Sequence, residues 1–207
     1  MALGTVIRSF AAPAASCVGL VWDGRALWTS SNTANLIYQI DPVTGTVIRS
    51  VASIGFEEGL AWDGRALWYL DATAPGLLSQ IDPVTGTIIR SLATPSTAPI
   101  GIVWDGRALW VCDFASDLID QIDPVTGTVI RSLAAPDGIA RGLGWDGHHL
   151  WCSGDTTNTI FELDPISGTV IRSFAAPGTN PAGLAWDGRT MWHVNFQTNL
   201  IYQIAVN

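Results

Sequence analysis

The chain repeats itself with a period of about 41 residues, within the range of roughly 20–50 residues that indicates a repeat architecture. This repeat constrains the fold more than any other feature. The motif GTVIRS, or its variant GTIIRS, begins at a constant step at Gly4, Gly45, Gly86, Gly127 and Gly168. A second landmark, Trp-Asp-Gly, begins at Trp22, Trp62, Trp104, Trp145 and Trp186. We therefore expect one domain, residues 1–207, with repeats at approximately 4–44, 45–85, 86–126, 127–167 and 168–207.

Each repeat divides into four short segments with strand character. In the first copy these are residues 18–22, 26–30, 36–40 and 46–51, separated by turn sequences such as Asp-Gly and Asp-Pro-Val-Thr-Gly. None has the length or the 3.6-residue period of a helix. Four-stranded units of about 40 residues in tandem are typical of β-propellers. The predicted fold is all-β, a five-bladed β-propeller of four-stranded antiparallel blades.

The two ends of the chain predict how the ring closes. The chain opens with a lone fourth strand, residues 5–10, and finishes with the first three strands of the fifth copy. We expect the N-terminal strand to complete the last blade, because an open array would leave unpaired edges. A closed ring favours a monomer. A glycine recurs in the first strand of every copy, which predicts close backbone approach at the axis; these are Gly19, Gly59, Gly101, Gly142 and Gly183.

Composition narrows the classes of partner. Ten arginines and no lysine stand against eighteen acids, for a net charge of −8, so nucleic acid is not an expected partner. No apolar run approaches the roughly 18 residues of a membrane span, so no membrane partner is expected. The start, MALGTVIRSF, lacks the regions of a signal peptide, and the default expectation is a cytoplasmic protein. Three cysteines without paired spacing predict neither a disulfide framework nor a zinc knuckle.

Comparing the copies separates repeated charges from individual ones. Nine acids recur in the Trp-Asp-Gly and Asp-Pro turns, and nine arginines recur with them. The other nine acids and Arg141 are individual, and they account for the whole net charge. Most fall in the loops between fourth and first strands and between second and third strands, which emerge on one face of a propeller. We call this the varied face and the opposite one, with the repeated turns, the repetitive face.

The varied face is the candidate site, because binding residues usually lie on loops of a rigid scaffold. The alternative is that its acids only keep the protein soluble. The candidate ligand-binding residues are Glu57, Glu58, Asp71, Asp113, Arg141, His193 and Asn195. No catalytic residue, cofactor or metal site is predicted.

Two candidates immediately precede an inner glycine, in the second and fourth copies. Glu58 and Arg141 should therefore face the mouth of the axial channel, where they could form an ion pair or bind a zwitterionic ligand. Asp71, Asp113 and Asn195 share the third position after the second tryptophan of their copies. With the two glutamates, the aspartates could offer oxygen ligands to calcium, or they could be solvated acids.

The histidines and tryptophans have a structural and a functional interpretation. His148 and His149 follow a Trp-Asp-Gly turn on the repetitive face, whereas His193 follows Trp192 within a strand. Three histidines that share no face make a poor metal site, and a lone histidine is usually structural. Two tryptophans per copy favour core packing, with a ring of exposed sugar-stacking platforms as the alternative.

The repeat unit GLAWDGRALW…LIYQIDPVTGTVIRSF resembles the blades of bacterial propellers of the NHL and YncE-like group, over essentially the whole chain. Residues 56–68, FEEGLAWDGRALW, are similar to glutamine cyclotransferases, which are also five-bladed. That family carries Gln-Gly-Leu where this chain has Glu58-Gly59-Leu60, and its longer loops are absent here. Tachylectin-type lectins share the blade count. The near-identical copies indicate recent amplification or design.

Three functions remain open at this point. The first is a non-enzymatic binding or display scaffold, whose partner is a small molecule, a sugar or a protein on the acidic face. The second is a lectin-like carbohydrate binder with sites between blades, which predicts exposed tryptophans. The third is a cyclotransferase-like or lyase-like enzyme at the channel mouth, which predicts a carboxyl group with a raised pKa beside a pocket.

Overall fold

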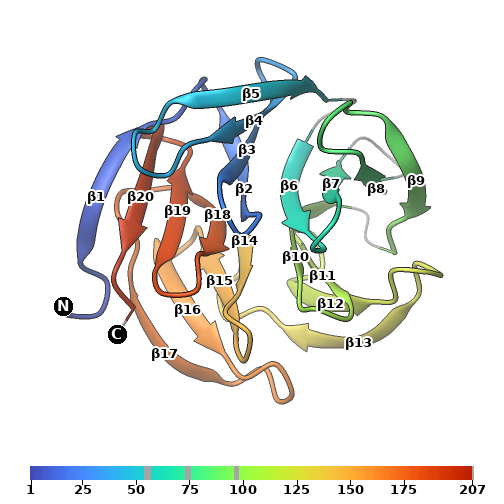
Figure 1. Ribbon diagram of the computed structural model, residues 1–207. Helices are drawn as coiled ribbons and strands as arrows, with labels where there is room; N and C mark the ends of the chain where they lie inside the picture. Colours follow the sequence, from blue (N-terminus) through green and yellow to red (C-terminus); the bar gives the residue numbers. More distant parts are fainter. Residues whose placement is uncertain (54–56, 73–75, 96–97, 207) are drawn as a thin grey trace.

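In the computed structural model, residues 1–53, 57–72, 76–95 and 98–206 are described. They form twenty strands and no helix, so within these ranges no helix could cross a membrane. The strands make five antiparallel sheets of four, arranged as blades around a central axis (Figure 1). The fold is the predicted all-β, five-bladed propeller.

The strands follow the repeat from blade to blade. Blade 1 contains β2 (Cys17–Trp22), β3 (Leu27–Ser31), β4 (Leu36–Ile40) and β5 (Val47–Ala52). Blade 2 contains β6 (Glu57–Trp62), β7 (Leu67–Asp71), β8 (Leu77–Ile81) and β9 (Ile88–Ala93). Blade 3 contains β10 (Pro99–Trp104), β11 (Leu109–Asp113), β12 (Leu118–Ile122) and β13 (Val129–Ala134). Blade 4 contains β14 (Ala140–Trp145), β15 (Leu150–Gly154), β16 (Thr159–Leu163) and β17 (Val170–Ala175). In blade 1 the strands coincide with the predicted segments to within one residue at each end.

Blade 5 combines the two ends of the chain. It contains β18 (Pro181–Trp186), β19 (Met191–Asn195), β20 (Leu200–Ile204) and the N-terminal strand β1 (Val6–Ala11). β1 pairs antiparallel with β20, and beyond the strands Gly4 N donates to Ala205 O at 2.8 Å. The two termini lie side by side in Figure 1. The predicted closure is confirmed.

The turn before the third strand and the axis both use residues that suit an unusual backbone geometry. The residue before the third strand has positive φ in every blade, which Gly, Asn and Asp tolerate best; these are Asn35, Gly76, Asp117, Asn158 and Asn199. At the axis, a Cβ at Gly142 would overlap the carbonyl oxygen of Ala182, and one at Gly183 would lie 2.5 Å from Leu20 N. Only glycine allows the inner strands to approach this closely.

The repeated polar residues form one network in each blade. In blade 1, Trp28 Nε1 and Gln39 Nε2 donate to Asp23 Oδ2 at 2.7 and 3.0 Å. Arg49 Nε donates to Gln39 Oε1 at 2.9 Å, and its guanidinium lies 5.1 Å from the centroid of the Trp28 ring. Blades 2, 3 and 5 repeat this network, whose aspartates are Asp63, Asp105 and Asp187. We call it the Asp–Trp–Gln–Arg network. It ties the Trp-Asp-Gly turn to the three outer strands.

The tryptophans of the second strands are core residues, as predicted. Each is at most 1% exposed and packs between neighbouring blades; these are Trp28, Trp68, Trp110, Trp151 and Trp192. The tryptophans of the Trp-Asp-Gly turns are partly buried and surround one hollow of about 70 Å³; these are Trp22, Trp62, Trp104, Trp145 and Trp186. They converge on the axis rather than forming five separate platforms between blades.

Candidate functional site

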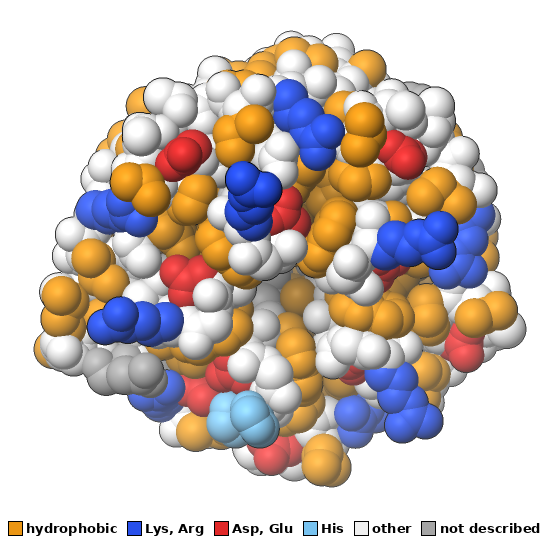
Figure 2. Space-filling view, viewed as in Figure 1, with side chains coloured by type: hydrophobic (Ala, Val, Ile, Leu, Met, Phe, Trp, Pro, Cys, Tyr) orange, Lys and Arg blue, Asp and Glu red, His pale blue; other side chains and the backbone are white. Residues whose placement is uncertain are grey.

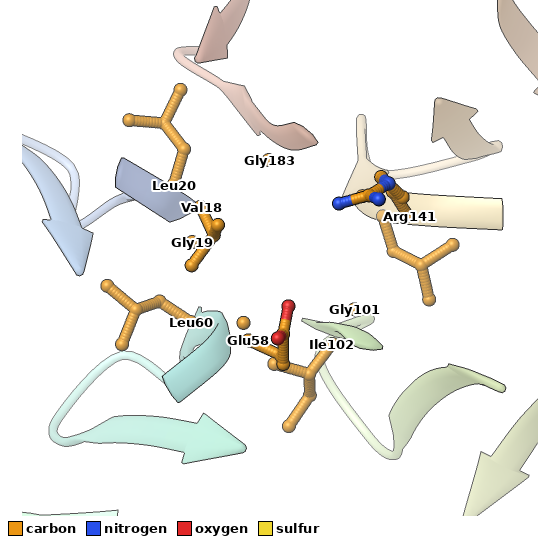
Figure 3. Close-up of a pocket in the computed structure, with 12 residues that line it drawn as sticks. Val18, Gly19, Leu20, Glu58, Leu60, Gly101, Ile102, Arg141 and Gly183 are labelled. Atoms are coloured by element: carbon orange, nitrogen blue, oxygen red, sulfur yellow. The ribbon is translucent and has the colours of Figure 1, made fainter. Parts of the chain in front are cut away.

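The axial channel itself is too narrow to hold a ligand. The inner strands leave a cavity of about 10 Å³ between them, which is room for about one water molecule. Glu58 of β6 and Arg141 of β14 line this cavity, and Figure 3 shows both side chains projecting into its mouth. The position predicted for these two residues is the one that the structure gives them.

A larger pocket opens beside the mouth, over blade 3, and we call it the mouth pocket. Its volume is about 300 Å³, at the lower end of the range for small-molecule sites. The lining residues are Glu58, Ala72, Ala98, Pro99, Ile100, Phe114 and Arg141. Ile100 is the blade 3 equivalent of Glu58 and Arg141, and Phe114 is 49% exposed. The mouth pocket therefore combines an apolar surface with a carboxylate from one neighbouring blade and a guanidinium from the other.

The guanidinium is held in place by an ion pair. Arg141 Nε donates to Asp155 Oδ2 at 2.9 Å, and the side chain of Arg141 remains 29% exposed. Asp155 is itself anchored, because its backbone N donates to Ile139 O at 2.9 Å. Asp155 lies outside the predicted site, and it positions a predicted residue of that site.

Asp113 and Asn195 connect two loops of their blades. Asp113 is 2% exposed and accepts hydrogen bonds from Ala98 N at 2.9 Å and from Ser116 N at 2.6 Å. The Asn195 amide donates to Thr179 O at 2.8 Å and accepts from Thr198 N at 2.9 Å. The shared position thus ties the loop before the first strand to the loop after the second strand. Neither residue is among those that line the mouth pocket.

In blade 4 the same two loops are connected by Asp137, which lies in the loop before the first strand. Gly154 occupies the shared position, and a Cβ there would overlap the carboxylate of Asp137. Asp137 Oδ2 accepts from Thr157 N and Oγ1 at 2.9 and 2.7 Å. Burial alone would raise the pKa of Asp137, but hydrogen bonds from Thr156, Thr157 and the Ile139 amide lower it overall. This individual acid therefore has a structural role.

Asp71 and His193 are not among the residues that line the mouth pocket. Asp71 is 9% exposed and pairs with Glu57 in the register of β6 and β7. The side chain of Glu57 lies outside the described residues. His193 is fully buried, its ring stacks on Tyr202 with centroids 6.1 Å apart, and burial lowers its pKa to about 4. Of the seven predicted residues, the mouth pocket brings together Glu58 and Arg141.

One cluster on the repetitive face was not predicted. His149 meets Asp146 and Glu162 there, and their ligand atoms lie within 4.8 Å of one another. Figure 2 shows this face, where histidine surface lies close to acidic side chains; His193 is buried and does not contribute to it. The sequence predicts no metal site, because its three histidines share no face. The signal that could have found the cluster is that Glu162 replaces a glutamine that recurs in every other copy.

Comparisons with known proteins show the fold. No known family's sequence profile matches the chain, and no curated protein matches it in sequence. Glutaminyl cyclase from Myxococcus xanthus is similar in structure, with a TM-score of 0.81 and 17% identity over 97% of this chain and 95% of that one. Virginiamycin B lyase from Staphylococcus aureus is similar with a TM-score of 0.58 and 19% identity, over 94% of this chain and 68% of that one. A chain of a nidogen/laminin complex gives a TM-score of 0.69 and 20% identity, over 94% and 77%.

Proposed function

We propose that this protein is a non-enzymatic binding protein whose site is the mouth pocket on the varied face. We further propose that its ligand is a small zwitterion with an apolar body, such as an amino acid or the end of a peptide. One observation carries the proposal: a single pocket presents Glu58 and Arg141 together with the apolar residues of blade 3. An ammonium group would be attracted to the carboxylate, and a ligand carboxylate to the guanidinium.

The surroundings of Arg141 support this proposal. Binding costs less when the recognising side chain is already ordered. The ion pair with Asp155 orders the guanidinium while leaving it partly exposed. The apolar surface of Ile100, Pro99 and Phe114 would then contact the body of the ligand.

The placement of the thiols and of His193 favours binding over catalysis. Cys17, Cys112 and Cys152 are buried, and burial raises the pKa of Cys112 to about 12. A buried, protonated thiol is a poor nucleophile. His193 is a neutral core residue at physiological pH, away from the mouth pocket. These four groups therefore offer no nucleophile or base to a ligand at the mouth.

We also propose that the blades derive from one ancestral blade of the NHL or YncE-like kind, by amplification or by design. The near-identical Asp–Trp–Gln–Arg networks of four blades support this origin.

The tryptophans do not favour a lectin with five inter-blade sites. Those of the second strands are buried, and those of the Trp-Asp-Gly turns converge on the axis.

Calorimetric titration with leucine, N-acetyl-leucine and leucine amide tests the binding proposal. We expect leucine to bind, and each blocked form to bind more weakly because it lacks one charge. A charge-assisted hydrogen bond contributes about 1.5–3 kcal/mol, so Glu58→Val and Arg141→Val should each weaken leucine binding by roughly tenfold to a hundredfold. Valine occupies the equivalent position in blade 1, at Val18, so these variants should fold.

An exposed residue outside the mouth pocket supplies the control. Gln197→Ala should leave leucine binding unchanged, because Gln197 does not line the pocket. Equal binding of leucine and its blocked forms would reject charge recognition. Release of ammonia from a peptide with N-terminal glutamine, lost in Glu58→Val, would instead support the cyclotransferase-like alternative.

A further inference from the structure

Blade 4 departs from the repeated network at three positions at once. Glu162 stands where the other blades have Gln39, Gln80, Gln121 and Gln203. His148 and His149 replace Arg-Ala of blades 1 to 3 and Arg-Thr of blade 5. Asp146, Trp151 and Arg172 keep their usual identities. All three new residues carry side chains that can bind metal ions.

The new side chains meet at one point. His149 Nδ1 lies 2.9 Å from Glu162 Oε1 and 3.6 Å from Asp146 Oδ2. Among the residues that the structure describes, these are the only three His, Cys, Asp or Glu side chains whose ligand atoms all lie within 4.8 Å of one another. The other four blades serve as internal comparisons, because each keeps the aspartate but has neither the glutamate nor the histidine.

The exchange of glutamine for glutamate changes the electrostatics of the network. In blade 1, Gln39 Nε2 donates to Asp23 Oδ2, whereas an ionised glutamate has no proton to donate to Asp146. Blade 4 instead brings two carboxylates together, and like charges at this range are stabilised by a cation between them. Arg172 pairs with Glu162 Oε2, which leaves Glu162 Oε1 directed at His149. A cation bound to Glu162 Oε1, Asp146 Oδ2 and His149 Nδ1 would neutralise both acids.

The distances and surroundings fit a small transition-metal ion. Zinc binds nitrogen and oxygen ligands at about 2.0–2.2 Å, so two ligands at a tetrahedral angle lie roughly 3.4 Å apart. The separations of 2.9 and 3.6 Å from His149 Nδ1 bracket this value. A pocket of about 290 Å³ opens on the cluster and is also lined by His148, so an ion can enter and a fourth ligand can approach.

The neighbouring residues would hold the ligands in place. Trp151 Nε1 donates to Asp146 Oδ2 at 2.9 Å, and Arg172 holds the far oxygen of Glu162. Glu162 is 3% exposed, so its carboxylate has little freedom to turn away. Such outer contacts orient the ligands in metal sites generally.

We propose that Asp146, His149 and Glu162 form a zinc-class divalent metal site on the repetitive face of blade 4. A water molecule or His148 completes the coordination. The site is independent of the mouth pocket, which lies on the opposite face.

Calorimetric titration with Zn²⁺ and the absorption spectrum of bound Co²⁺ test this proposal. We expect one ion per chain, a tetrahedral Co²⁺ spectrum, and no comparable binding of Mg²⁺. Loss of an outer contact costs about 10–100-fold in metal affinity, so loss of a direct ligand in Glu162→Gln or His149→Ala should cost at least as much. Both variants restore residues of blades 1 to 3, so they should fold, which their thermal unfolding will verify.

A matched control is available in blade 3. Gln121→Glu places a second carboxylate beside Asp105 without a histidine, and it should create no second zinc site. The proposal is overturned if the unmodified protein binds neither Zn²⁺ nor Co²⁺. It is equally overturned if folded Glu162→Gln and His149→Ala bind Zn²⁺ as tightly as the unmodified protein.

Discussion

At the residue scale, one position of the repeat holds five chemically different side chains. The residue after the second-strand tryptophan is Thr29, Tyr69, Val111, Cys152 or His193. Thr29 Oγ1 donates to Gly19 O at 2.7 Å, which satisfies its buried hydroxyl. Neither ring nitrogen of His193 has a well-formed hydrogen bond, although Gly183 O lies close enough to oppose part of the effect of burial on its pKa. Blade 5 therefore contains a buried imidazole, that of His193, whose protonation in the folded state is unfavourable.

The buried histidine predicts a specific acid sensitivity. The folded-state pKa of about 4 lies below the ordinary value of 6.5, so the unfolded chain takes up the proton first. The contribution of neutral His193 to the free energy of unfolding is therefore present in full above about pH 6.5, and it is lost as pH falls toward 4. At pH 5 the loss should be about 2 kcal/mol.

Urea unfolding at pH 7 and pH 5 measures this loss. His193→Val, which installs the residue of blade 3, should remove about 2 kcal/mol of the difference in unfolding free energy between the two pH values, because valine does not titrate. An unchanged difference would show that His193 is not the titrating group.

At the element scale, the inner glycines allow the first strands of neighbouring blades to pack closely. A Cβ at Gly142 would overlap the carbonyl oxygen of Ala182 in the next blade. Gly138, in the loop before the same strand, has only Thr156 Oγ1 near its Cβ position, at 3.8 Å. The same substitution should therefore have different effects at the two sites.

Replacing each glycine by alanine tests this difference. Gly142→Ala should destabilise the protein by about 1–3 kcal/mol or more, because the inner strands must move apart. For a chain of this size that is a fall in Tm of roughly 3–10 °C. Gly138→Ala should change the Tm little. Equal effects in thermal unfolding of the two variants would argue against crowding at the axis.

At the scale of the whole molecule, the ring is closed by contacts between residues distant in sequence. β1 supplies Arg8, whose Nε donates to Gln203 Oε1 at 2.8 Å and whose guanidinium lies over the Trp192 ring. Phe10 packs against the same tryptophan, with ring centroids 5.8 Å apart. The last blade thus lacks both an outer strand and part of its packing until the N-terminus docks.

A truncation and a circular permutation distinguish closure from chain order. Removing residues 1–11 should lower the Tm and promote association through the exposed edge of β20. A permuted chain that begins at residue 45, with residues 207 and 1 joined by a short glycine-serine linker, keeps every strand and should keep the Tm and the association state of the unpermuted chain. Thermal unfolding and light scattering check both. A truncated chain with an unchanged Tm and an unchanged association state would contradict this role of β1.

The sequence by itself determined the propeller, the blade count, the closure and the inner glycines, because each follows from a local pattern repeated five times. It also placed Glu58 and Arg141 at the mouth, since their offset from an inner glycine fixes where they lie. Only the tertiary structure decided the roles of Asp113, Asn195 and Asp137, which bridge two loops that are separated along the chain.

The tertiary structure also decided which individual residues meet. Arg141 pairs with Asp155, and Glu162 of β16 reaches His149 in the turn between β14 and β15. Such encounters depend on side-chain directions across neighbouring strands, and a comparison of aligned positions within the repeat does not contain them. The repeat fixes the scaffold because packing is the same in every blade. The residues that depart from the repeat can act together only where folding brings them into contact.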